Sequence, residues 1–97
     1  MKAVMQRGAR ANFHAAMRFY RKNATTSVAM AFAADLDATS ALLLATPLLG
    51  SQLLGKVRKL EMRRFPYELI YFISGDDIRI IAVAHEHRQQ NYWVGRK

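Results

Sequence analysis

The chain has 97 residues, and 52% of them are apolar, which is enough to build one domain around one hydrophobic core. It contains no cysteine, so disulfide bonds, a thiolate nucleophile and cysteine-based zinc sites are excluded. There are 15 Lys and Arg against seven Asp and Glu. The resulting net charge of +8 favours anionic partners: nucleic acid, an acidic protein or a membrane surface.

The charge is concentrated in two segments that flank an apolar middle. Residues 1–22 carry six Lys and Arg and no acid, whereas residues 23–55 carry only Asp35 and Asp37. This middle is long and apolar enough to suggest a membrane helix. However, each Asp would cost about 2.5–3.5 kcal/mol at the centre of a bilayer. Because Pro47 also shortens the apolar run, we predict a buried core helix and no membrane partner.

The first half of the chain predicts a strand followed by two helices. A short strand over residues 2–6 is followed by a break at Arg7-Gly8. Over residues 9–22, apolar residues recur at three- and four-residue spacing, which is typical of an amphipathic helix with a basic opposite face. A second helix begins after the N-capping candidates at residues 25–27 and ends at Pro47, and we predict a loop over residues 48–55.

After Gly55 the apolar pattern changes to a period of two, which is typical of strands. We predict strands over residues 57–64, 67–74 and 78–85, with a hairpin turn at Gly75-Asp76-Asp77. The order β-α-α-β-β-β predicts an α+β fold formed by a single domain over residues 1–97. Its antiparallel sheet is covered on one face by the N-terminal helical hairpin, and the other face is partly open and basic.

Several residues are expected to form the core where the second helix meets the sheet: Phe32, Leu36, Leu43, Leu60 and Ile80. The aromatic residues of the second C-terminal strand are expected to pack as well: Tyr67, Tyr71 and Phe72.

The most specific motifs lie between Val57 and Trp93. They are Val57-Arg58-Lys59-Leu60, Arg63-Arg64-Phe65-Pro66-Tyr67, Ala82-Val83-Ala84-His85 and a His-x-x-Arg-x-x-x-x-Trp ending. With the element order, these motifs resemble the RelE/ParE superfamily of toxins from type II toxin–antitoxin (plasmid stabilisation) systems. The resemblance covers nearly the whole chain.

The resemblance implies a cytoplasmic bacterial protein that stops growth and is neutralised by a cognate antitoxin, with no cofactor and no metal. Family targets differ. RelE-like members are mRNA interferases that cleave mRNA in the ribosomal A site, and ParE-like members poison DNA gyrase. The fold alone does not choose between the two, because function depends on the site.

The resemblance also assigns candidate catalytic residues. Lys59 falls on one family lysine, and Arg63 and Arg88 match a basic and a catalytic position. Tyr92 lies near the family tyrosine. Glu61 and Glu68 fall where the family has a lysine and a phosphate-binding arginine, and a carboxylate there would repel a scissile phosphate.

His85 is a further candidate, because histidine titrates near neutrality and can act as acid or base. The alternative is that His85 ends a strand and satisfies a backbone or tyrosine partner. The remaining basic and aromatic candidates are binding residues: Arg58, Lys59, Arg64 and Trp93. Trp93 and Tyr92 either stack on bases, close the end of the core or contact the antitoxin.

These observations favour a ParE-like gyrase poison over a ribosome-dependent ribonuclease, because Glu61 and Glu68 interrupt the cationic set. An inactive basic binding module is the third reading. We expect the site on the sheet face away from the helices, where Lys59, Arg63 and His85 would meet Arg88 and Tyr92.

Overall fold

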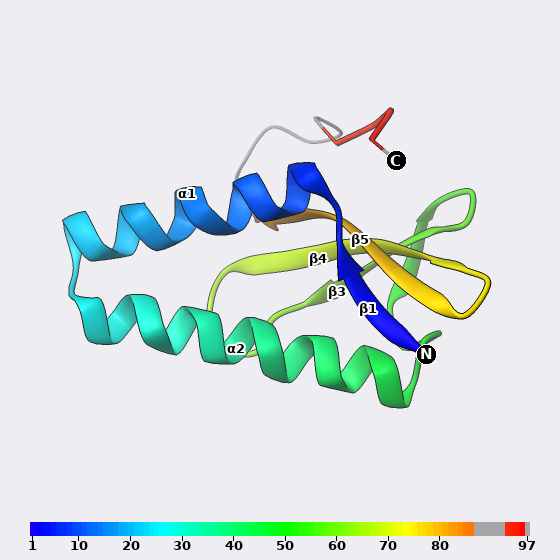
Figure 1. Cartoon of the computed structure of the whole chain (residues 1–97), viewed down its shortest axis with the longest axis horizontal. Coiled ribbons are helices and arrows are strands. Elements are labelled where there is room, and N and C mark those ends of the chain that lie inside the picture. The colour runs from blue at the N-terminus through cyan, green and yellow to red at the C-terminus, as the bar shows by residue number, and fades with distance from the viewer. Residues whose placement is uncertain (87–92, 97) are drawn as a thin grey trace.

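The computed structural model describes residues 1–86 and 93–96. Its elements follow the chain in this order: β1 (Lys2–Met5), α1 (Arg7–Asn23), α2 (Thr26–Ala45), β2 (Ser51–Leu54), β3 (Val57–Glu61), β4 (Tyr67–Ser74) and β5 (Asp77–His85). The two helices lie side by side, and the strands form a sheet behind them (Figure 1). The C-terminal residues lie beside the start of α1 (Figure 1).

The five strands form one sheet in the order β1-β5-β4-β3-β2. β1 pairs with β5 in parallel, and the other neighbours are antiparallel. The predicted α+β fold, with a helical hairpin on one face of the sheet, is therefore confirmed. β5 is an interior strand that lies between β1 and β4.

The predicted loop over residues 48–55 is wrong in part, because Ser51–Leu54 form β2. This strand pairs with β3, with Ser51 opposite Lys59 and Gln52 opposite Arg58. The reversal uses Gly55, whose φ of 56° lies in the left-handed region that glycine adopts without strain. The edge strand is exposed along its whole length, so it lacks the buried alternate residues by which a strand is recognised in sequence.

β3 ends at Glu61, three residues before the predicted end of the strand. The reason is a turn in which the N–H of Met62 donates to the carbonyl of Tyr67. The carboxylate of Asp35 in α2 accepts hydrogen bonds from the backbone N–H groups of Arg64 and Phe65, at 2.9 and 3.2 Å. Asp35 is thus buried but satisfied, and it fixes the turn that reverses the chain into β4.

By length and composition α2 is apolar enough to cross a membrane. In this fold it packs as a core helix and buries a stripe that includes Ala29, Phe32, Leu36 and Leu43. It begins at Thr25, whose hydroxyl accepts a hydrogen bond from the N–H of Val28 at 3.0 Å, as the capping pattern predicted.

The core between helices and sheet is aromatic. Phe32 is fully buried and contacts the rings of Phe13, Tyr20, Phe65 and Tyr67. Leu36, Leu43 and Ile80 are buried as predicted, and Leu60 is half-buried against the same cluster.

A second, smaller apolar cluster lies on the other face of the sheet. It is formed by Ile70, Ile81, Ala82, Ala84 and Trp93. A β-bulge places Ile81 between the paired residues Ile80 and Ala82. Because one extra residue changes which face the following side chains occupy, the bulge turns the end of β5 so that Val83 and His85 face the helices.

Candidate functional site

The open face of the sheet brings Lys59 together with acidic side chains. Lys59 Nζ lies 3.7 Å from a carboxylate oxygen of Glu68 on the neighbouring strand. Glu61 stands directly opposite Glu68 in the register of β3 and β4. Strand alternation puts Lys59 and Glu61 on the same face, so one ammonium group faces two carboxylates. Further along the sheet, Arg79 lies 3.9 Å from Asp77. Two cations of this face, Lys59 and Arg79, therefore lie beside carboxylates, and a third, Lys56, lies 4.5 Å from the ring of Phe72.

Arg58 does not share this face. It pairs with Tyr71, whose side chain is buried on the helix side of the sheet. Its guanidinium donates to the carbonyl of Gly50 at 2.7 Å and holds the segment that leads into β2. The described contacts of Arg58 are therefore with the entry to β2, and its predicted binding role remains a prediction.

Arg63 and Arg64 are both exposed in the turn between β3 and β4. Their position is set by Asp35, which accepts the backbone N–H groups of Arg64 and Phe65. Because the turn is anchored to α2, the two cationic side chains project from a fixed backbone. The predicted binding role of this pair remains a prediction.

His85 lies on the face opposite to Lys59, so the expectation that the two converge is wrong. The bulge at Ile81 is the physical reason, since without it the end of β5 would turn the other way. The imidazole packs edge-on against the ring of Tyr67, with a centroid separation of 5.0 Å. This contact agrees with the alternative to an acid or base role for His85, in which the residue ends a strand and has a tyrosine partner.

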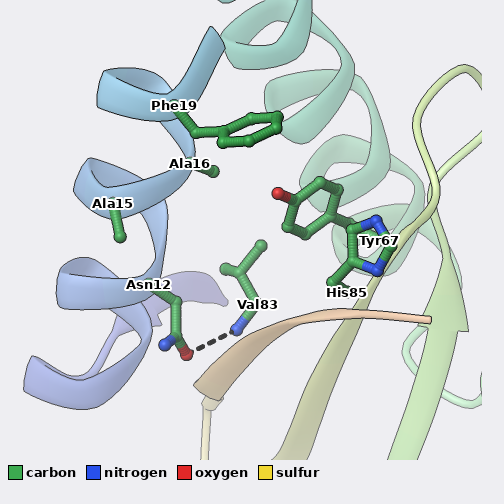
Figure 2. A pocket seen from close by; sticks show the side chains of 7 residues that line it. All are labelled: Asn12, Ala15, Ala16, Phe19, Tyr67, Val83 and His85. Carbon is green, nitrogen blue, oxygen red and sulfur yellow. Dashed lines mark hydrogen bonds between the residues drawn. The ribbon is translucent and has the colours of Figure 1, made fainter. Parts of the chain in front are cut away.

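A groove of about 420 Å³ lies between α1 and the end of β5. Figure 2 shows Asn12, Ala15, Ala16 and Phe19 on the helix side, facing Tyr67, Val83 and His85. Its walls are mainly apolar, and His85 and Tyr67 supply an imidazole and a phenol. Phe19 is 55% exposed, which leaves much of its ring available to a partner. The sequence pattern around residues 12–19 indicated only an amphipathic helix, so this groove was missed.

Three candidates lie in or next to the C-terminal segment: Arg88, Tyr92 and Trp93. Arg88 and Tyr92 fall outside the described residues. Trp93 is 5% exposed and packs in the second cluster, so its ring closes the open-face core, one of the roles expected for it.

A polar clasp joins the C-terminal segment to α1. Arg96 donates to the side-chain carbonyl of Asn12 at 2.9 Å and to the backbone carbonyl of Ile81 at 3.0 Å. The same oxygen of Asn12 accepts the N–H of Val83 at 3.1 Å (Figure 2). Gly8 leaves room for Arg96, because a Cβ at residue 8 would lie 2.6 Å from Nε of Arg96. The clasp holds the chain just after Trp93 against the start of α1.

The outer surface of α1 is strongly basic. Five exposed cations and no acid lie on this helix: Arg7, Arg10, Arg18, Arg21 and Lys22. Arg21 and Lys22 occupy the last turn, where the helix dipole favours positive charge. Arg7 lies in the first turn, where the dipole disfavours a cation by about 0.3–1 kcal/mol. Cations therefore occur on α1 even in the first turn, where the helix dipole disfavours them. Such a uniformly basic surface is typical of one that meets an anionic partner.

A helical hairpin packed on one face of a mixed sheet, in the element order that the structure shows, is the fold that the motifs predicted. Residues 4–90 match the family described as ParE toxin of type II toxin-antitoxin system, parDE. The chain therefore belongs to this family, within the RelE/ParE superfamily of type II toxins.

The same fold is found in a solved structure described as the chromosomal ParDE TA system from P. aeruginosa. The two chains superpose with a TM-score of 0.77 at 20% sequence identity, over 88% of this chain and 95% of the other. A search of curated proteins finds no match.

Proposed function

We propose that this toxin acts in the cytoplasm by poisoning DNA gyrase and is not a ribonuclease. The observation that carries the proposal is the acidic surrounding of Lys59, which is 3.7 Å from Glu68, with Glu61 opposite Glu68 in register. RNA cleavage without a metal needs cations against the scissile phosphate to stabilise the charge that develops on it. The two carboxylates on the same sheet face would repel the negative charge on the phosphate. The ammonium group of Lys59 is also paired with Glu68 and so is less available to a phosphate.

We further propose that the cognate antitoxin covers α1 and the groove beside it. The apolar walls around Phe19 and His85 suit an apolar anchor, and the cations of α1 suit acidic side chains next to that anchor. An acidic amphipathic segment meets both requirements. Association with such a segment should slow markedly as salt rises, because electrostatic steering is screened. An association rate that is independent of salt would contradict the electrostatic part of this proposal.

The experiment for the target induces the chain alone in bacteria and follows DNA supercoiling and translation in parallel. The proposal expects supercoiling to fail first and co-expression of the antitoxin to restore growth. Translation failing first, with transcripts cut in the ribosomal A site, would favour the RelE-like ribonuclease. Growth that continues unchanged would favour an inactive binding module.

Charge variants separate the two toxin mechanisms. Glu61→Lys with Glu68→Arg restores the cations that a ribonuclease needs, and should raise ribosome-dependent cleavage only if the scaffold can cleave RNA. Tyr92→Phe should leave a gyrase poison active, whereas a ribonuclease that uses the phenol should lose much of its rate. Arg63→Ala and Arg88→Ala should reduce toxicity. Arg63→Ala should leave the fold intact, because Arg63 is exposed and exposed charges contribute little to stability. Toxicity equal to that of the parent in all these variants would place the site elsewhere.

A further inference from the structure

The exposed large apolar side chains are concentrated in one segment of the chain. Ten large apolar side chains are exposed in the described part of the chain, and six of them are leucines within residues 42–54: Leu42, Leu44, Leu48, Leu49, Leu53 and Leu54. Leu48 and Leu54 are 64% and 58% exposed. Single exposed leucines need no explanation, but six within thirteen residues of sequence are typical of an interaction surface.

The same segment forms an unprotected edge of the sheet. β2 is the terminal strand, so within the described residues one side of its backbone has no strand partner. Proteins usually protect such an edge with charged residues or proline. Here residues 38–55 contain no Asp, Glu, Lys or Arg, and the only proline, Pro47, precedes the strand. The edge of β2 is therefore open to another strand.

From these two features we propose that β2 is a self-association edge, on which a second copy of this chain pairs antiparallel about a two-fold axis. In such an interface the same residues meet on both copies, and residues 38–55 bring no like charges together. The cations beside β2 have partners within the chain: Arg58 donates to the carbonyls of Leu48 and Gly50, Lys59 lies 3.7 Å from Glu68, and Lys56 lies 4.5 Å from the ring of Phe72. Elsewhere on the surface two copies that each carry +8 would repel each other. An acidic partner would gain little from an uncharged edge and would be drawn to the cations of α1. The proposal does not depend on gyrase or RNA as the target.

The geometry of β2 fits this occupant. Arg58 donates to the carbonyl of Gly50 at 2.7 Å and Tyr71 accepts the N–H of Gly50 at 2.9 Å, so the entry to the strand is held in place before any partner binds. Gly55 closes the turn at the other end. A strand fixed at both ends loses little conformational freedom on pairing. The two joined sheets would bury the exposed leucines of both copies at the two-fold axis.

The test is sedimentation of the purified chain, from low micromolar concentration to its solubility limit, at low and high salt. We expect a monomer–dimer equilibrium that tightens as salt rises, because salt screens the repulsion between two basic copies. Leu54→Lys should raise the dissociation constant of the dimer about tenfold or more, since it places an ammonium group of each copy in the strand pair and adds to the repulsion between two basic chains. Gln52→Lys tests the same edge at an exposed polar position and so keeps the test valid if Leu54→Lys folds poorly.

Phe19→Lys is the matched control, because Phe19 is 55% exposed and lies on α1, far in sequence from β2. It should leave the dimer unchanged. A chain that stays monomeric at every concentration would overturn the proposal. So would a dimer that Phe19→Lys breaks and both β2 variants leave intact. Loss of antitoxin binding on Leu54→Lys in a monomeric chain would also overturn it, and would assign the edge to the antitoxin.

Discussion

The two edges of the sheet are protected in different ways. On one side β1 ends at Met5, while β5 continues to His85 beneath α1. There the side chain of Asn12 accepts the N–H of Val83, and Arg96 donates to the carbonyl of Ile81. These side chains thus satisfy backbone groups of β5 that a neighbouring strand would otherwise bond. On the other side β2 carries no charge of its own and is bordered by exposed leucines. One edge is thus closed within the monomer, whereas the other is the edge that we propose pairs with a second copy.

At each edge a glycine lies close against a large side chain, Gly8 against Arg96 and Gly50 against Tyr71. At Gly8 an added Cβ would meet the end of the Arg96 side chain, which can move. At Gly50 it would lie 2.5 Å from the hydroxyl of Tyr71 and 2.6 Å from the carbonyl of Lys59. The carbonyl is backbone and cannot move without disturbing β3. The same substitution should therefore cost more at the β2 edge than at the α1 edge.

The largest effect is expected at Phe32, which lies in the core between the two edges. Phe32→Ala removes a fully buried ring with four aromatic neighbours and should cost about 3–5 kcal/mol in the free energy of unfolding. Denaturant unfolding should be followed by Trp93 fluorescence, which reports one edge, and by circular dichroism, which reports the whole. Both midpoints should fall together. Separate midpoints would show that the two edges of the sheet unfold independently and do not share one core.

Gly50→Ala should have the next largest effect on the free energy of unfolding. Its Cβ forces the Lys59 carbonyl and the Tyr71 ring apart, and such overpacking costs about 1–3 kcal/mol. Thermal unfolding monitored by circular dichroism measures this cost. Gly55→Ala is a control for the turn, where open space surrounds the Cβ and only the left-handed backbone is strained. Equal stability of Gly50→Ala and the parent would contradict the close packing at this edge.

Tyr71→Phe should cost about 0.5–1.5 kcal/mol for each net hydrogen bond lost. The hydroxyl accepts the N–H of Gly50 and donates to the carbonyl of Pro47, both at 2.9 Å. The substitution removes both bonds and leaves the ring in place. Chemical denaturation at neutral pH gives the difference, and an unchanged midpoint would show that the hydroxyl does not hold the entry to β2.

Tyr71 also makes stability depend on alkaline pH. Burial raises the pKa of Tyr71 above its usual value of 10.0, against the opposing effects of the Gly50 N–H and the Arg58 charge. The folded state therefore keeps a proton that the unfolded state loses. This contribution is fully present below pH 10.0 and is lost as the pH rises through the folded pKa. The parent should lose stability more steeply than Tyr71→Phe above that pH, and parallel curves would contradict this.

Gly8→Ala should have the smallest effect on stability, because alanine is favoured in a helix by up to about 1 kcal/mol and offsets the displaced Arg96. Its expected signature is local. Trp93 is the only tryptophan and is 5% exposed, so loosening the clasp should shift its emission to longer wavelength. Arg96→Ala should produce the same shift, and the double variant should add nothing further. An unchanged emission in both single variants would show that the clasp does not position Trp93.

Periodicity was sufficient to predict the helical hairpin and the antiparallel strands. The alternation from Val57 onward and the apolar spacing of α2 are local signals, and they predicted Phe32, Leu36, Leu43 and Ile80 as core. The strand β2 was missed because its exposed residues carry no alternation. Its position is decided by pairing with β3 and by the turn at Gly55.

The candidate site was harder to predict because it depends on which face each side chain occupies. The bulge at Ile81 moves His85 to the helix side, and a single extra residue leaves no clear mark in a run of apolar residues. The role of Arg58 in holding Gly50 is equally hidden, since it depends on a segment eight residues earlier in the chain. By contrast, the acidic positions Glu61 and Glu68 were visible in the sequence, and the register places them opposite each other.

The most direct test of the proposed target is a supercoiling assay with purified DNA gyrase, relaxed plasmid and the purified chain. Our proposal predicts that the chain inhibits supercoiling at concentrations that leave translation in a cell-free extract unaffected, and that the cognate antitoxin restores supercoiling. Unimpaired supercoiling together with cleavage of ribosome-bound mRNA would contradict it.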